Sequence, residues 1–326
     1  VAMKFVHDDR DFDRLLQIVA ARLGLGVALV EKDYWVTHTL WALHAQGFEI
    51  WFKGGTSLSK GFGLIERFSE DLDLKLEPGA VRALHAVTNW TSEGSKATAQ
   101  RREHFEVLAD VLAVPGARVE IESIPDNRFR SANLRVDYPG KHRGVLATAM
   151  RPFVLLEFGC ARVTPFVARD MTSFVHEHLV RLGQLSAFAD NRPRAVRCVH
   201  PLVTLIEKLD ALTKRMPRDD APATFVRHFE DAARIIRANA LLPPLEEYRT
   251  ARALADEMLT KKQIVSLPSS RHPAFKLTDN ERWRLVQKAH DAIAPMFWGP
   301  RISLTEACDD IRGWLDDEIQ STADAR

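Results

Sequence analysis

One short stretch of the chain combines residue types that hold phosphate with residue types that hold a metal ion. It begins with two glycines and two hydroxylated residues: Gly54, Gly55, Thr56 and Ser57. Glycines let a backbone approach phosphate without a Cβ in the way, and the N–H groups that open a helix attract anionic oxygens. The Ser57 hydroxyl can add a donor, and Lys60, one turn later, can add a positive charge. We therefore predict that residues 54–60 bind the phosphates of a nucleotide.

Two carboxylates follow this turn on one predicted strand. Asp71 and Asp73 are two residues apart in the alternating run from Glu70 to Leu76, so both side chains should project from one face. Neighbouring carboxylates raise each other's pKa unless a cation lies between them, and Mg²⁺ takes oxygen ligands from carboxylates and substrate phosphates. We predict that Asp71 and Asp73 are catalytic and bind Mg²⁺, or Mn²⁺ in its place. The alternative is a solvated strand face beside an ordinary turn.

Other polar residues are candidates for the same site. Glu157 lies within an apolar run, where a charge needs a partner or a metal, so we predict it as a third metal ligand. Glu120 and Glu122 compete with it for this role. Arg67 and Ser69, between the turn and the acidic strand, are predicted to contact the nucleotide. Arg67 could instead orient Asp71, or be an ordinary surface arginine.

The surrounding pattern predicts the elements that position this stretch. Apolar spacing predicts helices at 8–24 and 27–46, and further helical segments at 56–66 and 78–115, the latter with a polar break near 91–98. Short apolar or alternating runs predict strands at 48–53, 70–76, 119–124, 133–138 and 153–163. After about residue 197 the pattern predicts only helices, at 201–215, 221–240, 244–262, 278–294 and 303–320. We expect an α+β fold with a mixed sheet and flanking helices over residues 1–195 and a helical domain over 196–326.

The composition excludes several classes of protein. Lys and Arg number 45 against 44 Asp and Glu, so a nucleic-acid partner must be held by a local patch rather than a general basic coat. The segment from Arg128 to Arg143 mixes basic and aromatic residues and is either such a patch or a solvated loop. No apolar run approaches the ~20 residues of a membrane span. Three separated cysteines predict neither a zinc site nor a disulfide framework. We expect a cytoplasmic protein without a membrane partner.

Several blocks of the sequence resemble known nucleotidyltransferases. The stretch from Gly54 to Asp73 is similar to the signature of the DNA polymerase β superfamily, and more narrowly to the AbiEii/AbiGii toxin family. Three further blocks resemble that family: Glu31–Val36, Leu205–Leu212 and Arg227–Asp231. The resemblance implies a two-lobed enzyme with a polymerase β-like core and a helical C-terminal domain. It implies transfer of a nucleotide from an NTP.

The resemblance also implies roles for residues in the C-terminal half. Lys208 is implied as a catalytic or phosphate-contacting residue, although a lysine that covers an apolar helix stripe is the simpler interpretation from the residues alone. Asp231 is implied as a catalytic carboxylate or a partner of Lys208, with a helix-surface aspartate as the alternative. Glu207 is implied as a nucleotide contact or is a surface residue.

The biology is implied by resemblance only. Members of the family act as toxins of bacterial toxin–antitoxin pairs, and some resemble the mycobacterial MenT-type toxins that add nucleotides to tRNA. The expected acceptor is therefore the 3′ end of tRNA, and the expected partner is an antitoxin, an AbiEi-like transcriptional regulator. Two alternatives stay open: a nucleotidyltransferase that modifies a protein hydroxyl, and a non-catalytic module that binds nucleotide or RNA. The intact Asp-x-Asp argues against the second.

Overall fold

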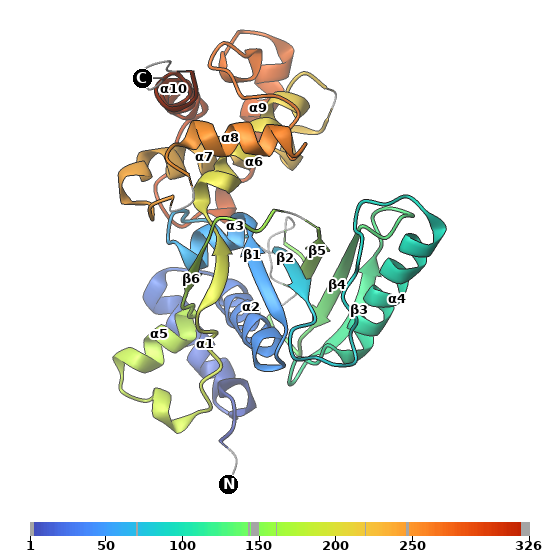
Figure 1. The fold of residues 1–326 in the computed structure, drawn as a ribbon. Helices are drawn as coiled ribbons and strands as arrows, with labels where there is room; N and C mark the ends of the chain where they lie inside the picture. The colour runs from blue at the N-terminus through green and yellow to red at the C-terminus, as the bar shows by residue number, and fades with distance from the viewer. Residues whose placement is uncertain are drawn as a thin grey trace. The chain divides into compact units, whose positions relative to one another are not determined.

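A computed structural model gives the fold of the chain and describes residues 3–69, 71–142, 144, 150–160, 162–218, 220–245 and 248–320. The chain forms two compact units (Figure 1). The first comprises residues 1–62, 69–163 and 168–198, and the second comprises 63–68, 164–167 and 199–326. The short segment 63–68 lies in sequence between the predicted phosphate-binding turn and the acidic strand. It nevertheless belongs to the second unit.

The first unit is built on a seven-stranded mixed sheet (Figure 1). The strands are β1 (Glu49–Lys53), β2 (Asp71–Glu77), β3 (Arg118–Ser123), β4 (Ser131–Asp137), β5 (Val154–Gly159), β6 (Phe166–Arg169) and β7 (Val196–Val199). Their spatial order is β3-β4-β5-β2-β1-β7-β6, with β2 antiparallel to β1 and parallel to β5. The two strands that carry the predicted metal ligands, β2 and β5, are therefore neighbours at the centre of the sheet.

Helices flank this sheet, some on its strands and some on the helix α2 (Val27–Ala45). They are α1 (Phe12–Leu23), α2 itself, α4 (Ser95–Val111) and α5 (Phe174–Arg181). The long helix α2 packs against β1 and β5, and α4 packs against β3 (Figure 1). Every second residue of β2, from Leu72 to Leu76, is buried in this core, and the residues between them are only half-buried. The alternation predicted for this strand is confirmed, and it leaves the acidic side chains on the face away from the core.

The second unit is helical. It contains α6 (Pro201–Arg215), α7 (Arg227–Arg237), α8 (Ala251–Thr260), α9 (Glu281–Ala292) and α10 (Leu304–Trp314), the last continued by a π-helix, Leu315–Gln320. Helix α7 packs against both α6 and α10. Fully buried side chains such as Phe225, Phe229 and Ile311 form the core of this second unit. Among the described residues, no helix has the length and apolar character needed to cross a membrane.

Short helices complete the chain. The predicted turn forms α3 (Gly54–Thr56), which continues as a π-helix, Ser57–Gly61. Within the described residues, the 3₁₀ helices with given bounds are Val6–Asp8, Leu185–Ala187, Pro222–Thr224, Asn239–Leu241, Pro273–Phe275 and Ala294–Met296. The α+β class is confirmed, with a mixed sheet, flanking helices and a helical C-terminal part.

The structure departs from the predicted elements in two places. Residues 78–94 contain no helix, because Pro78 and Gly79 open a turn and the Asn89 side chain accepts hydrogen bonds from the amides of Thr91 and Ser92. The sequence pattern also did not predict β6, α5 and β7. These elements are short, and the four residues of β7 directly follow a polar, proline-containing segment.

Candidate active site

Three carboxylates lie on two adjacent strands of the sheet. In the parallel pair of β2 and β5, the Cα partner of Asp73 is Glu157, and that of Asp71 is Leu155. On the other side of Asp73, β1 supplies Lys53 as the partner. A row of charged residues, Lys53, Asp73 and Glu157, therefore crosses three strands on the open face of the sheet. The structure brings together the three residues that the sequence predicts as metal ligands.

The electrostatics of Glu157 follow from this neighbourhood. Burial raises the pKa of its carboxyl group to about 7, and the negative charges of Asp73 and Asp71 add to the effect. A hydrogen bond to Asp73 favours the protonated form as well. Because carboxylates this close repel one another, the group is a place where a cation would be stabilised.

The competing candidates for the third carboxylate have other partners. Glu120 and Glu122 on β3 both contact Arg135 of β4, at 2.7 and 3.5 Å. Arg135 also lies 3.1 Å from Asp137. The segment from Arg128 to Asp137 is thus mostly strand rather than solvated loop, and its central arginine is neutralised by carboxylates. Arg143, at its far end, is outside the described residues.

The first glycine of the predicted turn makes a close approach to this acidic group. Gly54 has a φ of +75°, in the left-handed region that favours glycine. A Cβ added there would lie 1.7 Å from Oδ2 of Asp73. Any other residue at this position would displace the carboxylate, so the glycine is required by the packing of the turn over Asp73.

The hydroxyls of the turn face the protein. The Thr56 hydroxyl donates to the backbone carbonyls of Ser69, at 3.0 Å, and Asp71, at 2.7 Å, which ties the turn to the acidic strand. The Ser57 hydroxyl is buried beside the Cys198 thiol. Contacts of Thr56, Ser57 and Ser69 with a nucleotide stay predictions.

Two basic residues near the turn already have partners. The Lys60 ammonium group lies 2.5 Å from Oδ1 of the buried Asp33 and donates to the carbonyl of Thr172. Arg151, which the sequence analysis missed, donates from Nη1 to Oδ1 of Asp71 at 2.8 Å. Within the described part of the chain, no three His, Cys, Asp or Glu side chains are arranged as a ready-made metal site. In this structure the Arg151 guanidinium group contacts the Asp71 carboxylate.

The second unit contains a buried charge cluster of its own. Arg67 forms a bidentate pair with Asp231, with both N–O distances 2.7 Å. The Lys208 ammonium group donates to Oδ2 of the same carboxylate at 2.8 Å and lies 3.4 Å from Nδ1 of His228. Arg67 and Asp231 are each 1% exposed, so the surface interpretations of both are wrong. Arg67 is held by its pair with Asp231, and its predicted roles toward Asp71 and the nucleotide stay predictions.

The pKa values in this cluster reflect its excess of cations. Burial alone raises the pKa of Asp231, but Arg67 and Lys208 outweigh it and hold the value well below the usual range. Burial lowers the pKa of Lys208, against the opposing effect of Asp231. Burial also lowers the pKa of His228, and the positive charge of Lys208 lowers it further. Two cationic side chains thus share one carboxylate and a neutral imidazole. Glu207, next to Lys208, is half-buried, and its role stays a prediction.

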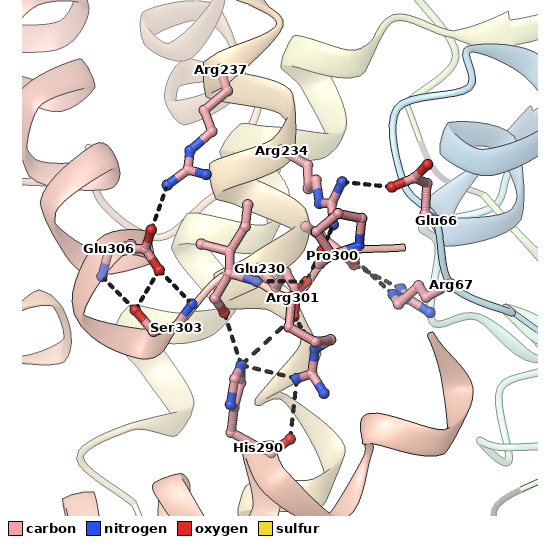
Figure 2. A network of polar contacts seen from close by, with 12 residues as sticks. Glu66, Arg67, Glu230, Arg234, Arg237, His290, Pro300, Arg301, Ser303 and Glu306 are labelled. Carbon is pink, nitrogen blue, oxygen red and sulfur yellow. Dashed lines mark hydrogen bonds and ion pairs between the residues drawn. The ribbon is translucent and has the colours of Figure 1, made fainter. Parts of the chain in front are cut away.

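A polar network holds Arg67 in place (Figure 2). Glu66 accepts from Arg234 of α7 at 3.1 Å, and its backbone carbonyl accepts from the amide of Trp298. Phe68 donates its amide to the carbonyl of Met296 at 2.8 Å. A Cβ at Gly299 would lie 1.9 Å from Oε2 of Glu66, so the loop fits tightly against the segment. Residues 63–68 are therefore fastened to the second unit on both sides of Arg67.

Glu230 anchors the other half of this network (Figure 2). It is 1% exposed and accepts from Arg301 at 2.8 Å and from the amide of Ile302 at 3.1 Å. Burial raises its pKa, but hydrogen bonds from His290, Arg301 and Ile302 outweigh burial and lower it. The sequence analysis did not single out Glu230, because the residue beside it, Asp231, carries the family resemblance.

The chain belongs to the AbiEii family: the family's sequence profile, described as a nucleotidyl transferase AbiEii toxin of a type IV toxin–antitoxin system, matches residues 40–309. The predicted family and enzyme class are thus confirmed. The resembling block at Glu31–Val36 lies before the matched range.

Comparison with curated proteins found no match. Among solved structures, the chain is similar to MenT4, a nucleotidyltransferase toxin from Mycobacterium tuberculosis H37Rv, at 18% sequence identity. The alignment covers 86% of this chain and 99% of that chain, with a TM-score of 0.39. Residue roles do not transfer at this level of similarity.

Proposed function

We propose that this nucleotidyltransferase uses Mg²⁺ to transfer a nucleotide from an NTP to the 3′ end of tRNA, in the cytoplasm, as the toxin of a toxin–antitoxin pair. The observation that carries the chemistry is the carboxylate group on β2 and β5, with Asp73 beside Glu157 and Gly54 packed over Asp73. The tRNA acceptor, and an AbiEi-like regulator as antitoxin, are proposed from the family resemblance alone.

The residues present fit a divalent cation. Asp71, Asp73 and Glu157 offer only oxygen donors, which Mg²⁺ prefers and Mn²⁺ accepts. Their mutual repulsion, expressed in the raised pKa of Glu157, is the electrostatic condition that a cation relieves. When bound, the ion would neutralise charge that develops on the transferred phosphoryl group.

The protein's own residues supply the remaining parts. Gly54 and Gly55 offer backbone N–H groups to the triphosphate. Arg151 releases the Asp71 carboxylate and binds a phosphate oxygen instead. Lys208, held by Asp231, contacts a phosphate. The acceptor hydroxyl oxygen bonds to the α-phosphorus, the bond from that phosphorus to the bridging oxygen breaks, and pyrophosphate leaves. A carboxylate accepts the hydroxyl proton.

A transfer assay tests the proposal. The protein is incubated with each α-³²P-labelled NTP, Mg²⁺ and bulk tRNA, and the label is followed on RNA and on protein. We expect label on the tRNA 3′ end, lost in Asp71→Ala and Asp73→Ala. Glu77→Gln is the matched control, because it removes a carboxylate from the same strand outside the acidic group.

Three outcomes contradict the proposal in different ways. Label on protein rather than RNA identifies a protein hydroxyl as the acceptor. Label transfer that EDTA does not abolish removes the metal from the mechanism. Toxicity in growing cells that persists in both aspartate variants favours a binding module without catalysis.

A further inference from the structure

A basic pocket lies at the end of α6 and the start of α9 in the second unit. Its volume is about 530 Å³. It is lined by residues 216–218, by a loop from Arg271 to Thr278, and by Asn280, Arg282 and Trp283 of the α9 start. Among the described residues that line it, four are Arg or Lys and none is Asp or Glu. Because the chain as a whole carries a net charge of only +1, this local excess of positive charge is specific to the pocket.

Three of these cations have no carboxylate partner. Arg218, Arg271 and Lys276 are exposed, and none forms an ion pair within the described part of the chain. Asp279, three residues after Lys276, is taken by Arg284 at 2.6 Å. A cluster of unpaired cations repels itself, so it costs stability unless an anion binds there.

The fourth cation forms the floor of the pocket. Arg282 donates to three backbone carbonyls, those of Arg215, Met216 and Asp220, at 2.8–3.0 Å. Its guanidinium group also lies 5.3 Å from the centre of the Phe225 ring. These bonds join the end of α6 to the start of α9, and all the acceptors are uncharged. The Arg282 charge therefore remains available to the pocket.

The walls of the pocket are apolar and rigid. Pro217, Pro273, Ala274 and Trp283 line it beside the cations. The His272 ring accepts from the amide of Ala274, and the Asn280 side chain accepts from the amide of Trp283, so both flanking turns are capped. Burial lowers the pKa of His272, which keeps the ring neutral near pH 7. A site with several cations, apolar walls and no acid suits a ligand with repeated phosphates.

The basic segment of the first unit is a less suitable phosphate-binding surface than this pocket. The arginines between 128 and 137 are engaged: Arg128 donates to the carbonyl of Glu93, Arg130 lies 3.7 Å from Asp126, and Arg135 is held by Glu120. Arg130 and Arg135, which already lie beside carboxylates, gain little from phosphate. The pocket in the second unit, whose cations are unpaired, gains more.

We propose that this pocket binds backbone phosphates of the nucleic-acid acceptor, as an RNA-anchoring site additional to the residues that hold the NTP. The identity of the anion as RNA rests on the proposed tRNA acceptor. The pocket itself rests on Arg218, Arg271, Lys276 and Arg282.

The test compares two triple variants that change charge equally. The pocket variant is Arg218→Gln, Arg271→Gln and Lys276→Gln. The control variant is Arg249→Gln, Lys262→Gln and Lys288→Gln, three exposed cations of the same unit outside the pocket and without ion pairs in the described chain. Binding of fluorescein-labelled tRNA is measured by anisotropy over a range of salt concentrations, without NTP.

We expect the pocket variant to bind tRNA roughly tenfold more weakly, with the slope of log K against log salt reduced by about 2–3. The control variant should keep the wild-type affinity to within about twofold. In the transfer assay, the pocket variant should raise the KM for tRNA and leave the KM for NTP and kcat unchanged. Equal losses in the two triple variants would overturn the site, because general charge would then explain them.

Other results distinguish a failure of the proposed RNA anchor from a failure of the proposed transfer activity. If the wild type transfers label to tRNA and the pocket variant keeps its tRNA KM, the pocket is not the RNA anchor while the function stands. If the wild type binds tRNA through the pocket but transfers nothing, the anchor stands and the function fails. If excess NTP displaces tRNA from the wild type as completely as unlabelled tRNA does, but does not displace the tRNA that still binds to the pocket variant, the pocket takes free nucleotide and the assignment to RNA is wrong. Loss of an acidic antitoxin from the pocket variant, with tRNA affinity unchanged, would also overturn it.

Discussion

The two units place a carboxylate in opposite electrostatic environments. Around Glu157 in the first unit, acidic neighbours and burial raise the pKa to about 7. Around Asp231 in the second unit, Arg67 and Lys208 overcome burial and lower it. Around the first carboxylate, burial and acidic neighbours outweigh the positive charge of Arg151, whereas around the second the cations are in excess. The first environment is suited to a cation that arrives with substrate, whereas the second is complete and holds a lysine in a fixed position.

The largest expected effect tests the second environment. Asp231→Ala leaves Arg67 and Lys208 buried without a counter-charge, which should lower the free energy of unfolding by about 3–5 kcal/mol. Asp310→Ala is the control, because its partner Arg237 is largely exposed and the pair is expected to contribute less than about 1 kcal/mol. Urea unfolding followed by circular dichroism measures both. Similar losses in the two variants would show that the buried cluster is not structural.

Lys208→Met sharpens the same comparison. It leaves the bidentate pair of Arg67 with Asp231 intact, so the loss of stability should be clearly smaller than in Asp231→Ala. Transfer activity should nevertheless fall, because Lys208 is proposed to contact phosphate. A folded variant with full activity would make Lys208 a purely structural lysine.

The next effect tests the first environment. Asp73→Asn should reduce kcat for nucleotide transfer by about 10²–10³-fold, the usual loss when one transition-state contact is removed. The melting temperature should not fall, because the substitution also removes a repulsive charge beside Glu157. Activity and thermal unfolding are measured on the same sample. A large fall in melting temperature would mean that Asp73 stabilises the fold rather than serving catalysis.

Acid stability is expected to fail in the first unit before the Asp231 cluster titrates. Burial lowers the pKa of His38 to about 3 and that of His176 to about 4, from 6.5. The unfolded chain therefore binds more protons below pH 6.5, so stability is full above that pH and falls toward pH 4, on the order of 3 kcal/mol per histidine. His176→Gln should flatten the pH dependence of urea midpoints between pH 6.5 and 4. An unchanged profile would place the acid-sensitive group elsewhere.

Sequence reasoning found the parts of the site that follow a local rule. Alternation placed Asp71 and Asp73 on one face, and a charge within an apolar run singled out Glu157. Helix α6 was predicted to the residue, because Pro201 opens it and an apolar stripe continues to its end. The pair of Arg67 with Asp231 spans 164 positions, and no local pattern records such a contact. Arg151 was not predicted either, because it lies outside any regular element and no local pattern marks its contact with Asp71.

The smallest expected effect concerns the network that holds Arg67. Glu66→Gln removes the charge that Arg234 contacts, but Glu66 is 45% exposed, so the loss of stability should stay below about 1 kcal/mol. The backbone bonds of residues 66 and 68 to 296 and 298 remain, and Arg67 should keep its position. Gly299→Ala is the sharper probe, because its Cβ would collide with the Glu66 carboxylate. If Gly299→Ala lowers activity far more than Glu66→Gln does, the steric fit of this loop positions Arg67; equally small effects on activity would limit the network to stability.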